Sequence, residues 1–277
     1  MSLAAALVLV LAQSLPGDLP EGVAAMRGEV ARRTVNENAP PSRLDSCLAL
    51  AGSDAAAAER SATGWLREER GSHQALPQLC LGTAYSTAQN WTAAEGAFVS
   101  GRDLAADSDH LLRARLGAMA GNAALAAGTP AVALALLDLA RSDALAAGTA
   151  TLSGAIAIDR ARALVAMKRD SDAAAALSEA RADSPDNAEA WLLSATLARR
   201  EGKLAEAQQQ IEMAAHLAPT DPAIGLEAGV IAILAGRRDA AAASWRSAIA
   251  AAPASPEAAA ARGYLDEIGA AAAPEKR

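Results

Sequence analysis

The sequence predicts an all-α protein built as a solenoid of antiparallel helix pairs. Composition is the first reason: 52% of the 277 residues are hydrophobic, yet only 3% are aromatic, and the excess is alanine. Alanine favours helices, and a chain poor in aromatic and β-branched residues is a poor source of strands. The second reason is an internal repeat, because residues 154–255 divide into three consecutive blocks of 34 residues with no insertion. That period is typical of proteins in which each unit stacks only on its neighbours.

Several positions of the 34-residue block return in step. Small residues occupy the eighth, twentieth and twenty-seventh positions, a larger residue the twenty-fourth, and proline the thirty-second. The small residues are Ala161, Ala195 and Gly229 at the eighth position, Ala173, Ala207 and Ala241 at the twentieth, and Ala180, Ala214 and Ala248 at the twenty-seventh. The twenty-fourth position holds Leu177, Ile211 and Trp245, and the thirty-second holds Pro185, Pro219 and Pro253. Small residues let two helices approach closely, the larger one fills the space between units, and proline cannot continue a helix.

The block 188–221 shows how one unit is built. Apolar residues at helical spacing predict a first helix over about 188–200 and a second over about 204–217. Between them, residues 201–203 form a turn in which Gly202 supplies backbone freedom.

Residues 75–108 carry a fuller form of the same pattern, with Leu81-Gly82 and Tyr85 on a first helix and Phe98 on a second. The whole pattern resembles the tetratricopeptide repeat, a helix-turn-helix unit of this length. The resemblance implies a right-handed superhelical solenoid of antiparallel helix pairs. It also implies that the first helices line a concave face, which the family uses to hold peptides or partner helices.

We expect the array to occupy residues 43–270. Its units are expected at 43–74 (a degenerate pair), 75–108, 114–147, 154–187, 188–221 and 222–255, with a capping helix at 256–269. The unit 114–147 departs from the family pattern, because Leu145 stands where proline is usual and six extra residues, 148–153, follow it. We expect a longer second helix or a loop there, and a disordered tail over 271–277.

The N-terminus predicts export. Residues 1–12 are an uncharged apolar run, too short to span a bilayer, and Val10 and Ala12 fit a signal peptide cleaved after Ala12. The alternative is an N-terminal helix packed on the first repeat of a cytoplasmic protein. Residues 13–42 then form a linker in which 21–34 could be a short helix. The resemblance and the apolar run together indicate an exported bacterial protein, periplasmic or secreted.

The chain has two cysteines, Cys47 and Cys80. Each falls on the expected first helix of adjacent units, and such helices are neighbours. With export, this placement predicts a disulfide between them. Two buried free thiols are the alternative.

No pattern predicts catalysis, a metal site or a cofactor. His73, His110 and His216 have no partner at ligand spacing, and no phosphate-binding glycine motif or nucleophile elbow is present. A net charge of −7 without a basic face argues against nucleic-acid binding.

The partner face is predicted from the first-helix positions of the last three blocks. An apolar groove with an arginine cluster above it would suit an amphipathic helix, or an extended hydrophobic peptide with an acidic end. The residues are Ile158, Arg162, Val165, Glu189, Leu192, Thr196, Arg199, Arg200, Leu226, Val230, Ile233 and Leu234. Two alternatives remain open: the capping helix buries Leu226, Ile233 and Leu234, or two copies of the chain dimerise there.

These expectations predict a non-enzymatic scaffold, periplasmic in location, that binds a peptide or helix of another polypeptide on its concave face. A structural homo-oligomer and an accessory subunit of an envelope enzyme complex are the alternatives. The array fills nearly the whole chain, which leaves no room for a separate catalytic domain.

Overall fold

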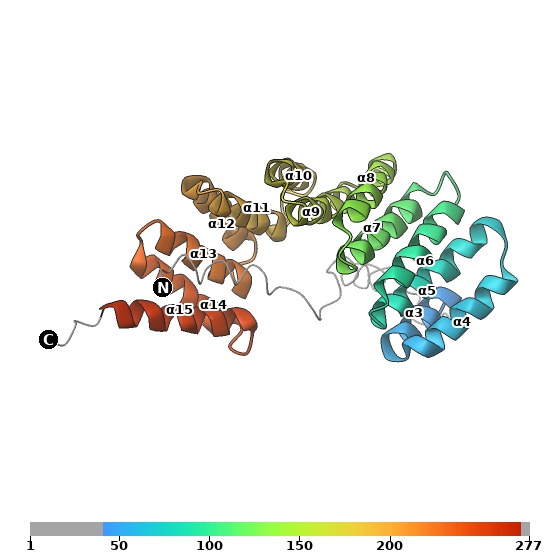
Figure 1. Ribbon diagram of the computed structural model, residues 1–277, viewed down its shortest axis with the longest axis horizontal. Helices are drawn as coiled ribbons and strands as arrows, with labels where there is room; N and C mark the ends of the chain where they lie inside the picture. Colours follow the sequence, from blue (N-terminus) through green and yellow to red (C-terminus); the bar gives the residue numbers. More distant parts are fainter. Residues whose placement is uncertain (1–40, 273–277) are drawn as a thin grey trace. The chain divides into compact units, whose positions relative to one another are not determined.

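A computed structural model describes residues 41–272 (Figure 1). The expected signal peptide at 1–12, the possible helix at 21–34 and the end of the tail, 273–277, lie outside the described residues. The chain divides into two compact units, the first ending at Thr149 and the second beginning at Ala150.

The described part of the first unit consists of helices in consecutive antiparallel packing. The helices are α3 (Arg43–Ser53), α4 (Ala55–Glu68), the short 3₁₀ helix η2 (Gly71–Gln74), α5 (Ala75–Thr87), α6 (Trp91–Leu104), α7 (His110–Ala126) and α8 (Pro130–Ala146). Aspartate and asparagine side chains begin several of them by accepting a backbone N–H, as Asp109 does from Leu112 at 3.1 Å. Each helix packs on the next, and α3 also packs on α5.

The second unit continues the pattern. Its helices are α9 (Ala150–Ala166), α10 (Asp170–Asp183), α11 (Ala188–Arg200), α12 (Leu204–Leu217), α13 (Pro222–Leu234), α14 (Arg238–Ala251) and α15 (Pro256–Ala272). Helices α11 and α12 have the bounds that the block 188–221 predicts. Gly202 has a φ of 76°, the left-handed conformation that glycine adopts without strain, so the turn between them is tight.

Around residues 148–153, where the sequence predicts a longer second helix or a loop, the structure has longer helices. Helix α8 has 17 residues, whereas α6, α10, α12 and α14 have 14 each. Helix α9 also has 17 residues and begins at Ala150, four residues before the 34-residue block does. Only residues 147–149 connect α8 to α9. The C-terminal helix α15 likewise runs past the expected end at 269, to Ala272.

The eighth and twenty-fourth positions of a block meet inside each helix pair. Gly82 lies against the ring of Phe98, Gly121 against Leu137, and Gly229 against the indole of Trp245. A Cβ atom at any of these glycines would overlap the facing side chain. The units with Leu177 or Ile211 at the twenty-fourth position have alanine at the eighth position instead. The core is therefore built from small residues on first helices that receive large residues from second helices.

The last helix closes the core of the second unit. Helix α15 packs on α14 and α13, and its Tyr264 is buried with its ring centroid 5.1 Å from that of Trp245. Among the described helices, none is long and apolar enough to cross a membrane.

Candidate protein-binding face

The predicted partner residues lie on α9, α11 and α13, the first helices of three consecutive pairs. We call the exposed side of these helices the first-helix face. It is defined by Arg162 and Val165 on α9, by Glu189, Leu192, Thr196, Arg199 and Arg200 on α11, and by Leu226, Glu227, Ile233 and Leu234 on α13. Ion pairs join each helix of the face to the next one.

The first ion pair bridges α9 and α11. Arg162 contacts the Glu189 carboxylate and also pairs with Asp159, one turn earlier on its own helix, at 2.5 Å. The guanidinium is thus held between two carboxylates. Its charge is compensated within the protein, so Arg162 is a structural link between the two helices.

The second ion pair bridges α11 and α13. Arg199 Nε donates to Glu227 Oε1 at 2.6 Å, and the two side chains are only 7% and 13% exposed. Arg200 is different: it lies 3.9 Å from Asp170 of α10, and both side chains are about one-third exposed. The predicted arginine cluster is therefore one nearly buried structural arginine and one accessible arginine.

This difference predicts unequal effects of two neighbouring substitutions. Arg199→Ala is expected to lower the free energy of unfolding by about 2 kcal/mol, because Glu227 would be left largely buried without its cation. Arg200→Ala should change it by less than about 0.5 kcal/mol, because exposed ion pairs contribute little. Urea denaturation of both variants checks this, and equal losses would contradict the structural role of Arg199.

Two predicted partner residues lie in the core instead. Ile158 is 2% exposed and Val230 is 5% exposed. Ile158 packs in a cluster with Ala157, Ala180 and Ala190, which joins α9, α10 and α11. A partner docked on the first-helix face would not reach either side chain, so both support the face from inside.

The accessible apolar residues of the face are on α11 and α13. Leu192, Leu226 and Ile233 are half-buried, and Leu234 is 46% exposed. The alternative in which the capping helix buries Leu234 is not what the structure shows, because α15 directs Tyr264 onto Trp245 and leaves Leu234 open. Thr196 donates its hydroxyl to the Leu192 carbonyl at 3.1 Å, so the polar group here is already satisfied.

The two cysteines lie where the sequence places them. Cys47 on α3 and Cys80 on α5 are at disulfide distance, with Cα atoms 6.1 Å apart. Both are buried in one cluster with Ala51, Ala58 and Ala62. The pair links the helix pair α3/α4 to the one that follows it.

One charged cluster was not predicted from the sequence. Asp143 on α8 accepts from Arg102 on α6 at 2.8 Å, and it lies 3.6 Å from Arg113 and 3.9 Å from His110 on α7. The cluster ties three helices together around one carboxylate. Its members are up to 41 residues apart in the sequence, so no short sequence pattern predicts the cluster. Within residues 41–272, no cluster of histidine, cysteine and acidic side chains could hold a metal ion.

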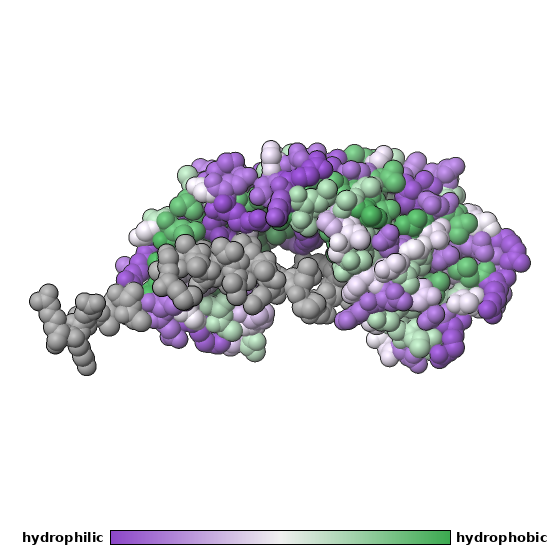
Figure 2. All heavy atoms as spheres, in the orientation of Figure 1, coloured by the Kyte–Doolittle hydropathy of each residue, from purple (hydrophilic) through white to green (hydrophobic). Residues whose placement is uncertain are grey.

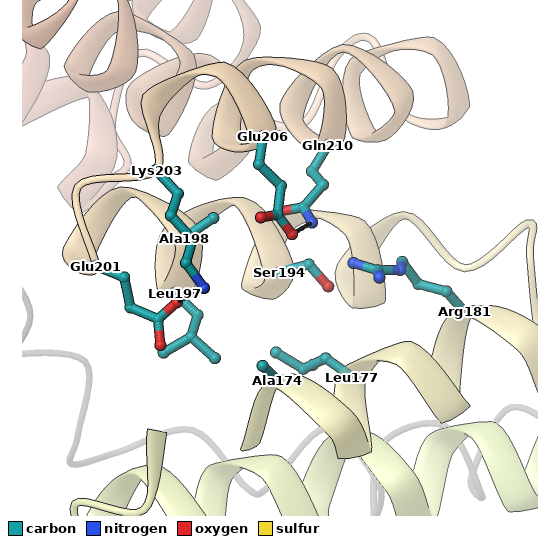
Figure 3. A pocket seen from close by; sticks show the side chains of 10 residues that line it. All are labelled: Ala174, Leu177, Arg181, Ser194, Leu197, Ala198, Glu201, Lys203, Glu206 and Gln210. Atoms are coloured by element: carbon teal, nitrogen blue, oxygen red, sulfur yellow. Dashed lines mark hydrogen bonds and ion pairs between the residues drawn. The ribbon is translucent and has the colours of Figure 1, made fainter. Parts of the chain in front are cut away.

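Surface chemistry differs along the chain. In Figure 2, hydrophilic residues cover much of α10 to α12, and hydrophobic residues gather over α7 and α8. On α8, the side chains of Val132, Leu139 and Leu145 are exposed. A small pocket lies between α10, α11 and α12 in the hydrophilic region (Figure 3). Sequence reasoning missed this pocket because its residues come from two successive blocks and from three helices.

Comparison with known proteins gives the class of fold. No protein-family model matches the chain, and no curated protein matches it in sequence. Among solved structures, PilF of Pseudomonas aeruginosa is similar with a TM-score of 0.62 at 17% identity, over 81% of this chain and 97% of PilF. PilW, a widely conserved type IV pilus biogenesis factor, has a TM-score of 0.61 at 18% identity, over 79% of this chain and 97% of PilW. YrrB, a tetratricopeptide-repeat protein with an unusual peptide-binding site, has a TM-score of 0.51 at 20% identity, over 74% of this chain and 99% of YrrB.

The fold is therefore that of a tetratricopeptide-repeat protein. The consecutive helix pairs, the glycine-to-aromatic contacts and the structural neighbours agree on it. The all-α fold class predicted from the 34-residue period is confirmed.

Proposed function

We propose that the protein is a non-enzymatic scaffold that binds a peptide or helix of another polypeptide on the first-helix face. The observation that carries the proposal is the apolar surface on two successive first helices. Leu192 of α11 and Leu226 and Ile233 of α13 are half-buried, Leu234 of α13 is exposed, and Arg162 and Arg199 beside them are engaged in ion pairs. A single exposed leucine is ordinary, but apolar side chains aligned on neighbouring helices mark an interaction surface.

The partner chemistry follows from the charges on the face. Because Arg162 and Arg199 are neutralised by Glu189 and Glu227, they offer little to an acidic ligand. Arg200 has the longest ion pair of the three arginines, because its guanidinium lies 3.9 Å from Asp170. The structure therefore favours an apolar helix or peptide with at most one acidic contact, rather than a strongly acidic segment. YrrB is a neighbour whose peptide-binding site shows that this fold can serve such a role.

We further propose that the protein is exported to the periplasm. The cysteine pair at disulfide distance supports this, because disulfides persist in oxidising compartments. The uncharged apolar run at residues 1–12 supplies the expected signal.

Site-specific photocrosslinking in the native host tests the face. A benzophenone amino acid at Leu234 is expected to crosslink to one other polypeptide. Met213 on α12 is the matched control, because its exposed fraction is 40% against 46% for Leu234, but it lies on a second helix. The control position should give no such product.

Each outcome of that experiment is informative. Crosslinking to a distinct polypeptide from Leu234 alone supports the scaffold. A crosslinked product of twice the mass of the chain would contradict the scaffold and support the homo-oligomer instead. Equal products from Leu234 and Met213, or none from either, would refute the assignment of the face.

A further inference from the structure

The pocket in Figure 3 lies away from the first-helix face, on the side where the second helices α10 and α12 flank α11. Its enclosed space measures about 40 Å³. That is well below the volume of ordinary ligand pockets, so it can take no more than a single small group, such as one amide with a small side chain, while the rest of a peptide stays outside.

The pocket combines an apolar wall with polar groups at its ends. Leu177 of α10 and Leu197 and Ala198 of α11 supply the apolar wall. In Figure 3, Arg181 enters from one end, and Lys203 and Glu201 lie at the other. Lys203 and Glu201 pair with each other at 2.7 Å, so that end carries no net charge.

Arg181 is held in place but makes no hydrogen bond or ion pair within residues 41–272. Its guanidinium carbon lies 5.0 Å from the centre of the Trp191 ring, and the Trp191 indole N–H is itself fixed by the Pro185 carbonyl at 2.9 Å. Partial burial lowers the pKa of the Arg181 guanidinium from its ordinary value, and the nearby Glu206 carboxylate opposes this shift. The side chain remains charged at neutral pH and keeps its donors available.

Gln210 provides the complementary group. It is 6% exposed, and its Nε2 donates to Glu206 Oε1 at 2.8 Å. Its Oε1 is buried and has no hydrogen-bond partner. An unsatisfied buried acceptor costs stability, so this atom is suited to receive a donor from a bound group. The pocket therefore presents free donors on Arg181 and a free acceptor on Gln210.

We propose that this pocket binds a neutral peptide amide with a small apolar side chain, from a partner polypeptide, as a second site independent of the first-helix face. The amide carbonyl accepts from Arg181, and the amide N–H donates to Gln210 Oε1. The apolar side chain lies on Leu177 and Leu197. A neutral group fits better than a carboxylate, because Glu206 and Glu201 stand beside the pocket.

The test is a titration followed by nuclear magnetic resonance. N-acetylalanine N-methylamide is the probe, and N-acetylalanine, which has nearly the same shape but a carboxylate, is the comparison. The expected result is a saturable shift of the Gln210 side-chain amide and the Trp191 indole N–H with the neutral probe, and weaker binding of the carboxylate.

Two variants and one control assign the contacts. Gln210→Met and Arg181→Met should each weaken binding of the neutral probe by about tenfold, the effect of one lost hydrogen bond in a desolvated site. Gln209→Met, on the exposed side of the same helix, should bind like the parent chain. The indole of Trp191 reports binding in all three variants, and the two binding variants lie on different helices, so misfolding of one leaves the other to decide.

Three results would overturn the proposal. Absence of a saturable shift with either probe means that only water occupies the pocket. Tighter binding of the carboxylate means that the pocket is an anion site. Undiminished binding by both Gln210→Met and Arg181→Met means that the assigned hydrogen bonds are not made.

Discussion

Gly229→Ala is expected to lower the free energy of unfolding by about 3 kcal/mol, because overpacking a filled core forces side chains and backbone to move. An alanine Cβ at this position would overlap Nε1 and Cδ1 of Trp245. The indole cannot easily withdraw, since it is 2% exposed, packs against Tyr264 and donates to the Leu226 carbonyl at 3.2 Å. Urea denaturation followed by circular dichroism measures the loss, and hydrogen exchange should place it in α13 to α15.

The matched control is Gly263→Ala in α15. A Cβ at Gly263 would meet nothing within 4 Å. The substitution should therefore be neutral or stabilise by up to about 1 kcal/mol through helix propensity. If both glycine substitutions have the same effect, the contact with Trp245 is not the cause of the loss.

A compensating substitution sharpens this prediction. Gly229→Ala combined with Trp245→Leu gives the same two residue types as the pair Ala161 and Leu177, which occupies these positions two repeats earlier. The double variant should be less destabilised than the sum of the single variants by about 2 kcal/mol, because residues in contact couple. Additive losses would show that the two positions act independently.

Removal of the cysteine pair is the second large effect. Cys47 and Cys80 are 33 residues apart. A crosslink closing a loop of that length stabilises by roughly 3–4 kcal/mol in the chain-entropy model. The double variant Cys47→Ala/Cys80→Ala should lose about that much in the α3 to α5 region. The helix pair α3/α4 depends on the link because, in a repeat array, each unit is stabilised by its neighbours.

The disulfide prediction is checked by unfolding with and without reductant. Reductant should lower the melting temperature of the parent chain and leave that of the double alanine variant unchanged. Identical melting of the parent chain in both conditions would contradict the crosslink.

Export is checked by the intact mass of the protein from its native host, measured after alkylation without reductant. The mass should show a chain starting near Gln13 with both cysteines unmodified. A full-length chain with two alkylated thiols would refute export.

Much of the fold could be predicted from the sequence because its determinants are local and periodic. The bounds of α11 and α12 follow from apolar spacing and from Gly202 in the turn between them. The small residue at the eighth position of each repeat follows from the sequence period, because the two helices of a pair approach closely there. The neighbouring placement of Cys47 and Cys80 follows from their positions in adjacent units, about one repeat apart.

The chemistry of the surface depended on the tertiary structure. The sequence places Arg199 and Arg200 side by side, but only the angle between α11 and α13 decides that Arg199 reaches Glu227 and becomes buried while Arg200 stays accessible. The same packing puts Ile158 and Val230 inside the core rather than on the face. The pocket is lined by residues from three helices, among them Arg181 of α10 and Gln210 of α12, which only the packing of these helices brings together. The repeat by itself determined which helices pair, because that depends on residue size at fixed spacing. Which side chains remain free to bind depends on contacts between helices, and these are settled by geometry that no single repeat encodes.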